Sequence, residues 1–448
     1  MQRGQFSSRL AFILAASGSA VGLGNIWGFP TNAAENGGAA FVLMYMILAF
    51  LLAYPAMMAE LIIGRHTQSN MVNALQSISS TPAAKRAGWA VGMGGMITAS
   101  LILCFYSLVA GWMLAFMLEP LTTLIGLPQL GNWLTEFSLA RNVGFAALFI
   151  GLTAQVISAG VEQGIEKWSQ RLMPSLFALL IGLILYVLMQ PGAIQGLEHY
   201  LVPDFSQMSD PKLIVSAMGQ AFFSMSLGVG TMLIYGSYIR SDENLPLVGA
   251  LVTLTDTGIA FLAGLLVLPA MFVAQHLGVT IYAESGSLIA GPDLIFQVLP
   301  ALFDGMGAAG VFVGLAFFVL MSIAAVTSSI SMLEVPVSYA VEAQQISRTK
   351  ATWLVALIIF AISSTIAMNF DSLFGFVITL TTERAQPLLS MFICIFAGWI
   401  FYRNSILSEI QKGNPDVEQS LFWKIWPVYV KLFCPVLILL TFAQGFIG

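Results

Sequence analysis

The feature of this sequence that most restricts its fold is a series of long apolar stretches. A helix needs about 20 apolar residues to cross the hydrocarbon core of a bilayer. We predict a membrane-spanning helix in each of eleven stretches, which lie near 10–35, 39–64, 88–118, 142–160, 170–190, 213–239, 245–275, 308–341, 351–369, 373–402 and 422–447. The polar pieces between them are expected to be loops, and the longest are 66–87, 119–141, 191–212, 276–307 and 403–421.

The composition supports a bilayer as the solvent of this chain. Hydrophobic residues make up 58% of it and charged residues only 9%, whereas a soluble protein carries roughly 25% charged residues. We therefore predict an all-α polytopic membrane protein of about eleven spans.

The first stretch follows Arg3 and Arg9 and is too long for a signal peptide, so we expect it to be retained. Cys104, Cys394 and Cys434 lie in apolar stretches, which argues against a disulfide framework.

The distribution of lysine and arginine indicates the orientation. With the N-terminus in the cytoplasm, most basic residues fall on the cytoplasmic side, as the positive-inside rule requires. They are Arg3, Arg9, Arg65, Lys85, Arg86, Lys167, Arg171, Arg240, Arg348, Lys350, Arg403, Lys412 and Lys424. Eleven spans then put the C-terminus outside, and we expect a multi-pass protein of the inner (cytoplasmic) membrane. No basic patch points to nucleic acid, and the three histidines have no metal-ligand spacing.

Glycines interrupt two predicted spans at matching positions. The first span contains SAVGLGN (19–25) and the sixth contains FFSMSLGVGT (222–231), and both include the pattern small–apolar–Gly–apolar–Gly–polar. Because the two spans are five places apart in the series, the second copy enters the membrane from the opposite side. Paired interrupted spans are typical of inverted-repeat transporters, whose substrate site lies between the breaks. Gly18 and Gly22 alone are also compatible with close helix packing, but packing does not explain a matched pair.

Polar oxygen atoms gather in two further spans. Thr327, Ser328 and Ser329 lie within 308–341, and Asp256 lies within 245–275. One hydroxyl in a membrane helix often only bonds the preceding turn, but three in a row exceed that need. Hydroxyl, carbonyl and carboxylate oxygens suit a hard cation, and an acid inside a membrane is a functional candidate by default. These residues predict a cation site.

With these motifs the chain resembles the neurotransmitter:sodium symporter family, in particular its bacterial amino-acid transporters, such as the bacterial leucine transporter. The resemblance covers residues 6–400, and its most specific stretches are SAVGLGNIWGFP…AAENGGAAF (19–41), GQAFFSMSLGVG (219–230), YGSYIR (235–240) and VTSSIS (326–331). It implies one transporter domain over 1–448, with broken helices one and six. Its five-plus-five inverted repeats would cover about 9–190 and 213–402, and 422–447 would be an extra helix.

The resemblance also implies two sodium sites and a substrate site at the breaks. Sodium site one would use Ala20, Asn25, Ser224 and Asp256 together with the carboxylate of the substrate. Sodium site two would use the carbonyls of Gly18, Val21 and Ala324 and the hydroxyls of Thr327 and Ser328. The substrate would contact Ala20, Leu23, Gly24, Ile102, Tyr106, Phe223, Ser224, Ser226, Val229, Ser329 and Met332.

The family resemblance assigns parts of the substrate to parts of this site. The substrate carboxylate would meet the N–H groups of Leu23 and Gly24 and the hydroxyl of Tyr106, and Phe223 resembles an aromatic lid. Family members that carry monoamines have an aspartate where Gly22 stands, so the substrate here should bring its own carboxylate. The mainly apolar pocket favours a hydrophobic or aromatic α-amino acid.

The gates follow the family on one side only. Arg3 and Glu342 match the family's cytoplasmic gating ion pair. On the outer side, the family usually has an arginine where Gly28 stands, and here that arginine is missing. Span ten instead carries Arg384 at membrane depth. Arg384 either anchors its span through a buried partner or supplies the missing charge of the gate, and the sequence leaves both readings open.

We therefore predict a symporter that takes up a hydrophobic or aromatic α-amino acid with sodium by alternating access, and not an enzyme. Chloride should be unnecessary, because Asp256 supplies a fixed negative charge where the resembling chloride-dependent members are neutral. The alternatives are an amino-acid sensor of the same fold without transport, or a symporter for another carboxylate-bearing amine such as a small zwitterion. Sodium ions, the amino acid and the lipid bilayer are the expected partners, and the oligomeric state is left open.

Overall fold

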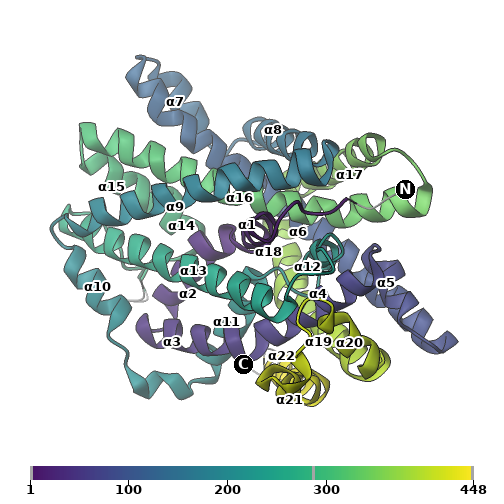
Figure 1. The fold of residues 1–448 in the computed structure, drawn as a ribbon. Coiled ribbons are helices and arrows are strands. Elements are labelled where there is room, and N and C mark those ends of the chain that lie inside the picture. The colour runs from purple at the N-terminus through teal and green to yellow at the C-terminus, as the bar shows by residue number, and fades with distance from the viewer. Residues whose placement is uncertain (1–3, 285–287, 445–448) are drawn as a thin grey trace.

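The computed structural model describes residues 4–284 and 288–444. This part of the chain is almost entirely helical, and its one β-bridge, between Tyr282 and Leu288, is isolated. Figure 1 shows the long helices packed around a centre that contains α1 (Arg9–Ala20). This helix packs against α9, α13 and α16, which come from distant parts of the sequence.

The first half of the chain alternates long helices with short ones, and the short π-helical turns (η1 to η3) keep the chain helical while they widen it locally. After α1 the elements are η1 (Gly24–Gly28), α2 (Phe29–Glu35), α3 (Ala39–Leu48), η2 (Ala49–Ala53), α4 (Tyr54–Thr67), α5 (Met71–Ser77), α6 (Pro82–Leu124), α7 (Pro128–Thr135), α8 (Leu139–Ser158), η3 (Val161–Glu166), α9 (Lys167–Leu188), α10 (Ala193–Leu201) and the 3₁₀ turn η4 (Phe205–Ser209).

The second half begins with another short, interrupted helix. Its elements are α11 (Pro211–Ser224), α12 (Thr231–Gly236), α13 (Leu245–His276), α14 (Gly291–Asp293), η5 (Leu294–Val298), α15 (Leu299–Gly305), α16 (Ala308–Gln344), α17 (Arg348–Met368), α18 (Phe370–Ile378), η6 (Thr379–Ala385), α19 (Gln386–Ile395), η7 (Phe396–Ile400), α20 (Arg403–Gln411), η8 (Val417–Gln419), α21 (Leu421–Val428), η9 (Tyr429–Phe433) and α22 (Cys434–Gln444).

Polar side chains determine where several of these helices begin. Ser8, Asn70, Asp210, Asn244 and Ser420 each precede a helix, and each accepts a hydrogen bond from a backbone N–H of its first turn. These N–H groups have no partner within the helix, so a side-chain acceptor at this position stabilises the start of the helix by about 1 kcal/mol.

The helices account for the eleven expected spans. Within the described residues, eight helices are long and apolar enough to cross a membrane, and two bent pairs raise this number to ten. One pair is α1 with η1–α2, bent by 54°, and the other is Phe370–Ile400 with α20, bent by 98°. The remaining expected span, 213–239, consists of α11 and α12, which are separated by residues 225–230.

The pieces that were expected to be loops also contain helices. In order they hold α5, α7, α10, α15 and α20, so the prediction of plain loops is wrong there. In α10, the buried residues Ala193, Gly196 and Tyr200 follow a helical spacing, and this face packs against α13. A short amphipathic helix of this kind gains its stability from tertiary packing.

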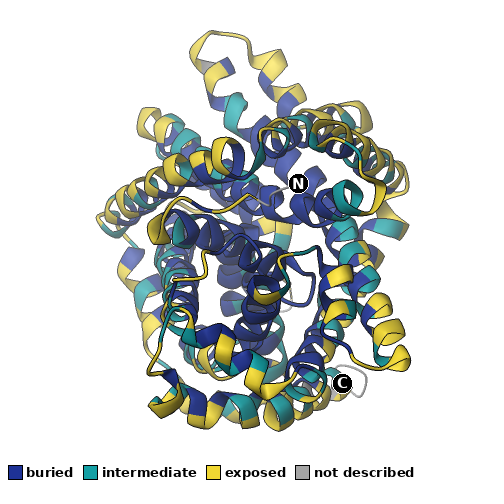
Figure 2. Ribbon diagram, turned by 45° about the vertical axis from the view of Figure 1, so that its right-hand side comes forward, coloured by how far each residue is buried: buried dark blue, intermediate teal, exposed yellow. Residues whose placement is uncertain are grey.

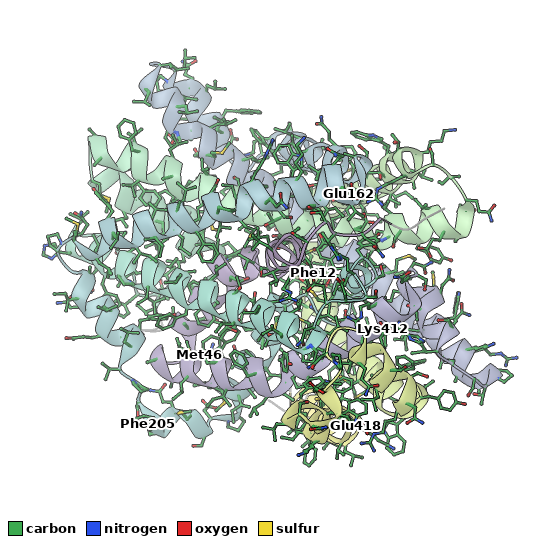
Figure 3. The ribbon with its side chains drawn as sticks, viewed as in Figure 1. Phe12, Met46, Glu162, Phe205, Lys412 and Glu418 are labelled. Atoms are coloured by element: carbon green, nitrogen blue, oxygen red, sulfur yellow. The ribbon has the colours of Figure 1, made fainter. Side chains whose placement is uncertain are left out.

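The distribution of apolar residues is that of a membrane protein. Figure 2 shows buried residues at the centre of the bundle and exposed ones around it. Many of the exposed side chains are large and apolar, such as Leu185, Leu254 and Leu357 on α9, α13 and α17. Lipid tails are as apolar as leucine, so these side chains lose nothing by facing a bilayer. In Figure 3, Phe12 of α1 lies near the middle of the molecule and Phe205 near its edge.

Candidate functional site

The first break lies between α1 and η1. The helix α1 ends at Ala20, and Val21 leaves the helical region with φ −72° and ψ 100°. The interruption leaves backbone carbonyls available to other elements: the carbonyl of Ser19 accepts a hydrogen bond from Ser328 Oγ at 3.0 Å. Unwound backbone inside a membrane protein is tolerated where it is buried or lines a cavity, and every residue from Ser19 to Ile26 is buried.

The second break separates α11 from α12 at residues 225–230. Three of these residues, Ser226, Gly228 and Gly230, have positive φ values of 52°, 81° and 84°. A Cβ on Gly228 would lie 2.3 Å from the carbonyl oxygen of Gln386, so the chain needs a glycine at this close approach. Ser226 adopts a conformation that side chains rarely take, and such backbone strain is typical of functional sites.

Asp256 joins the two breaks from the middle of α13, where it is fully buried. Its carboxylate lies 2.7 Å from Asn25 Nδ2, and its two oxygens lie 3.0 and 2.9 Å from Ser224 Oγ. The hydroxyl of Tyr45 donates to it at 3.3 Å. Within the described residues these partners are all neutral, and a buried carboxylate with only neutral partners strongly favours a nearby cation. Ala20, the remaining residue of the first predicted sodium site, ends α1.

The hydroxyl cluster on α16 faces the first break. Thr327 Oγ1 lies 3.4 Å from the carbonyl oxygen of Val21 and 3.0 Å from that of Ala324. Gly18 packs beside Thr327, because a Cβ placed on Gly18 would lie 3.3 Å from Thr327 Cβ. The structure thus places the Thr327 hydroxyl beside two of the predicted carbonyl ligands, whereas the hydroxyl of Ser328 donates to the carbonyl of Ser19.

A small cavity lies between the breaks. It is lined by Ala20, Gly22, Leu23, Gly24, Ile102, Tyr106, Phe223, Ser224, Ser226, Val229, Ser328, Met332 and Gln386. Ten of the eleven predicted substrate residues are in this set, and Ser329 is not. The hydroxyl of Ser329 lies 2.8 Å from that of Thr153 on α8 and donates to the carbonyl of Val326. The serine of α16 that lines the cavity is therefore Ser328.

Gln386, which was not predicted, lines the cavity from the start of α19. A single glutamine in an apolar span matches no motif, although a buried polar side chain in such a span is a recognisable signal.

The absence of a side chain at Gly22 has a steric role as well. A Cβ on Gly22 would lie 2.2 Å from Ser328 Oγ and 3.0 Å from the hydroxyl of Tyr106.

A much larger cavity adjoins the first and is called the vestibule below. It has a volume of about 1050 Å³, whereas the small cavity has about 10 Å³, room for one water molecule. Leu23, Tyr106 and Phe223 line both, so these three side chains separate the two spaces. The backbone N–H of Leu23 donates to the hydroxyl of Tyr106 at 3.3 Å. A ligand larger than a water molecule needs movement of these walls to enter the small cavity.

Neutral groups connect α2 and α11 along the vestibule. The amide of Gln220 donates to the carbonyl of Gly24 at 2.6 Å, and its oxygen accepts from Asn32 at 3.2 Å. Ser216 donates to the side-chain oxygen of Asn32 at 2.9 Å. Gly28, where the family's gate arginine would stand, faces the amide of Gln220. We call Gln220, Asn32 and Ser216 the amide network. Arg384 lines the same vestibule.

The predicted cytoplasmic gate lies only partly within the described residues. Arg3, the predicted partner of Glu342, lies outside the described residues. The carboxylate of Glu342 accepts hydrogen bonds from the backbone N–H of Asn70 at 3.0 Å and from its side-chain amide at 2.6 Å. Glu342 thus contacts the N-terminus of α5.

An ion-pair cluster holds α20 against α4. Glu409 is buried and lies 2.8 Å from Arg65 Nε, 3.2 Å from His66 Nδ1 and 2.7 Å from Lys412 Nζ. Burial opposes ionisation of Glu409, but hydrogen bonds from His66 and Lys412 and the charge of Arg65 outweigh it and lower the pKa of Glu409 to about 2. The sequence offered no signal for this pair, because 344 residues separate Arg65 from Glu409.

The histidines of the described part of the chain are neither clustered nor close to the breaks. No group of three or more His, Cys, Asp or Glu side chains there could hold a metal ion. His66, His199 and His276 all lie in the last turns of their helices rather than at the breaks.

Comparison with known proteins gives consistent matches. The model of the sodium:neurotransmitter symporter family matches residues 3–142 and 138–447. An uncharacterized sodium-dependent transporter of Bacillus subtilis, YhdH, is 31% identical over 98% of this chain and 97% of its own length. The sodium- and chloride-dependent taurine transporter of Bos taurus is 28% identical over 67% of this chain and 54% of its own length. The crystal structure of MhsT in complex with L-phenylalanine has a TM-score of 0.85 and 36% identity and covers 99% of both chains.

Proposed function

Since the chain belongs to the sodium:neurotransmitter symporter family, we propose that it takes up a hydrophobic or aromatic α-amino acid together with sodium and without a need for chloride. The family consists of sodium-dependent membrane transporters and not of enzymes. The finer assignments below, of substrate, ion sites and gates, are what the arrangement of this chain's residues supports.

The observation that carries the proposal is the buried carboxylate of Asp256 between the two breaks. It is fully buried, and its partners Asn25, Ser224 and Tyr45 are neutral. An unmatched buried charge is costly, and a bound cation removes that cost. Carboxylate, amide, hydroxyl and carbonyl oxygens are the ligands that hard cations prefer. A first sodium ion would therefore bind here, beside the carboxylate of the substrate.

Asp256 also supports independence of chloride. A sodium ion and the carboxylate of Asp256 compensate each other's charge inside the protein, so a second anion adds nothing to the balance. A second sodium ion would bind at Thr327, between the carbonyls of Val21 and Ala324.

The small cavity supports an amino acid with an apolar side chain. Ile102, Val229 and Met332 supply apolar walls, and Gly22 adds no acid that would pair with an amine lacking a carboxylate. The carboxylate of the substrate would meet the backbone N–H groups of Leu23 and Gly24 at the break. MhsT, which has been crystallised with L-phenylalanine, shares the fold over 99% of both chains, and this likeness favours a substrate of the same kind.

Coupling follows from the position of the ions and the substrate at the same two breaks. When the ions and the substrate bind, they bridge α1, α11, α13 and α16, and the two halves of the chain would rock around them. The vestibule would lead to the outside, Phe223 would cover the substrate, and Glu342 would close the cytoplasmic side. We propose inverted repeats over about 9–190 and 213–402, a cytoplasmic N-terminus and an inner-membrane location.

Uptake into liposomes tests this function. Purified protein is reconstituted, and labelled phenylalanine, leucine and tryptophan are offered with an inward sodium gradient. We expect accumulation that disappears when potassium replaces sodium and persists when gluconate replaces chloride. Sodium-dependent binding without accumulation would favour the sensor instead. If a folded, monodisperse preparation shows neither binding nor accumulation of any amino acid, the proposal is wrong.

A further inference from the structure

Gln386 occupies a distinctive place in the small cavity. It is the first residue of α19 and, among the described residues, the only one from span ten that lines this cavity, since the others come from α1, η1, α6, α11, α16 and the breaks. Its side chain is buried, with an exposed fraction of 1%. The backbone of Gln386 touches Gly228 in the second break. This glutamine therefore sits where α19 meets the unwound segment.

The nitrogen and the oxygen of its side-chain amide differ in their hydrogen bonding. Gln386 Nε2 donates to the carbonyl of Phe222 at 3.1 Å. Gln386 Oε1 is buried and accepts no hydrogen bond from any described residue. The bond to Phe222 fixes which way the amide points. Most buried polar atoms in proteins are hydrogen-bonded, and one that is not calls for an explanation such as a ligand.

The chemistry of a matching ligand follows from the rest of the cavity. If the proposed function holds, the α-carboxylate and α-amino groups of the substrate are bound at the breaks, so the donor for Gln386 must come from the side chain. Ile102, Val229 and Met332 are apolar, and they disfavour a side chain with several polar atoms. An indole N–H is a donor only, and a phenol needs one acceptor for its proton. Both offer an otherwise apolar ring with one donor.

We propose that Gln386 is a specificity-determining residue whose Oε1 accepts a hydrogen bond from an aromatic side chain that carries a donor, as in tryptophan or tyrosine. A substrate without that donor leaves Oε1 unpaired in a dry site. Sites built to bond a substrate N–H or O–H discriminate against analogues that lack it, because the buried partner is then unsatisfied. This inference rests on the proposed function.

The test compares substrates that differ only in the donor. Tryptophan is paired with 3-benzothienylalanine, in which sulfur replaces the indole N–H, and tyrosine is paired with 4-fluorophenylalanine. The dissociation constants are measured in sodium, and the ratio is formed within each pair for each protein. We expect the wild type to favour the donor in at least one pair by roughly tenfold. Gln386→Met should bring this ratio to about one, whereas Gln155→Met, on the exposed face of α8, should keep it.

Gln386→Glu separates recognition from anchoring. Glutamate keeps an acceptor but loses the N–H that bonds Phe222, so it should retain a preference for the donor. If the amide only anchored the break, Gln386→Glu would weaken all substrates alike and the ratio in the wild type would be about one. A ratio near one in the wild type, or an unchanged ratio in Gln386→Met, overturns the inference. Failure of the proposed function looks different, because then no amino acid binds in a sodium-dependent way.

Discussion

The side-chain amide of Asn25 donates to Asp256 twice, to its carboxylate at 2.7 Å and to its backbone carbonyl at 3.0 Å. The two residues are 231 positions apart in the sequence. The contact ties the first break to the centre of α13, and it also orients the amide oxygen of Asn25, which accepts from the backbone N–H of Gly22 at 3.1 Å. Through these contacts, a cation bound beside Asp256 would be linked to the backbone conformation of the first break.

Asp256→Asn should strongly impair sodium binding. It removes a buried negative charge from the proposed sodium site, and breaking a buried charge pair costs about 3–5 kcal/mol. We expect the sodium concentration for half-maximal uptake to rise by at least roughly a hundredfold, since 1.4 kcal/mol corresponds to tenfold. Residual uptake should then respond to chloride. Asp304→Asn, on an exposed turn of α15, is the control. Wild-type sodium dependence in Asp256→Asn would contradict the assignment.

Thr327→Ala should weaken sodium dependence before it alters the choice of amino acid. It removes one oxygen close to the carbonyls of Val21 and Ala324, and a hydrogen-bonding group at a charge contributes about 1.5–3 kcal/mol. We expect roughly a tenfold rise in the half-maximal sodium concentration and an unchanged phenylalanine-to-leucine ratio. Thr365→Ala removes a comparable helical hydroxyl from an exposed position. A changed ratio with normal sodium dependence would count against this site.

Gly22→Ala should reduce amino-acid binding. The added Cβ would lie 2.2 Å from Ser328 Oγ, and overpacking of this kind costs about 1–3 kcal/mol. We expect the dissociation constant for phenylalanine to rise at least about tenfold. Gly258→Ala on α13, where a Cβ meets nothing within 4 Å, controls for the added methyl group. Equal binding by the two variants would show that the break relaxes around position 22.

The cluster around Glu409 should make the stability of the protein fall in acid. The pKa of Glu409 is lowered from 4.5 to about 2 in the folded protein, so its contribution is complete above pH 4.5 and is lost as the pH falls towards 2. Glu409→Gln leaves buried Arg65 without this counter-charge and should cost about 3–5 kcal/mol at neutral pH. The melting temperature in detergent measures both effects. Glu418→Gln, at an exposed position, should match the wild type.

Arg384→Gln distinguishes the two readings of this arginine. Arg384 lines the vestibule together with Gly28 and Gln220, which favours a role at the outer gate. We expect roughly tenfold faster release of bound substrate, about the effect of one charged hydrogen bond, with an unchanged melting temperature. Lys212→Gln, which also lines the vestibule, controls for a general effect of charge. A lower melting temperature with normal release would instead identify Arg384 as an anchor of its span.

Much of the fold could be predicted because its main determinants are local. A long apolar stretch, or a span interrupted by glycines, can be recognised in the sequence without knowledge of tertiary contacts. The two breaks, at residues 21–23 and 225–230, lie at the glycine positions from which they were predicted. The short helix α10 escaped prediction because its stability comes from packing on α13, which no local pattern reveals.

In the candidate site, too, some residues could be predicted from local sequence patterns and others could not. The family resemblance placed Asp256 and Thr327 near the breaks, but it assigned Ser329 to the substrate, whereas the residue of this hydroxyl cluster that lines the cavity is Ser328. Neighbouring residues on a helix point about 100° apart, and the rotation of α16 turns Ser328 inward and Ser329 towards Thr153. Contacts between distant spans determine the position of Gln386 and the pairing of Arg65 with Glu409, so no short sequence motif could predict them.

The amide network that joins α2 to α11 consists of uncharged groups, and this has a consequence for how the protein responds to its surroundings. Screening by dissolved ions weakens attraction between charges over a distance of about 8 Å at physiological ionic strength. Hydrogen bonds among Gln220, Asn32 and Ser216 carry no net charge to be screened. The contact between these two helices should therefore be equally strong in dilute and in saline water. For that contact, added potassium chloride is an inert background, and added sodium chloride acts only through the sodium that binds.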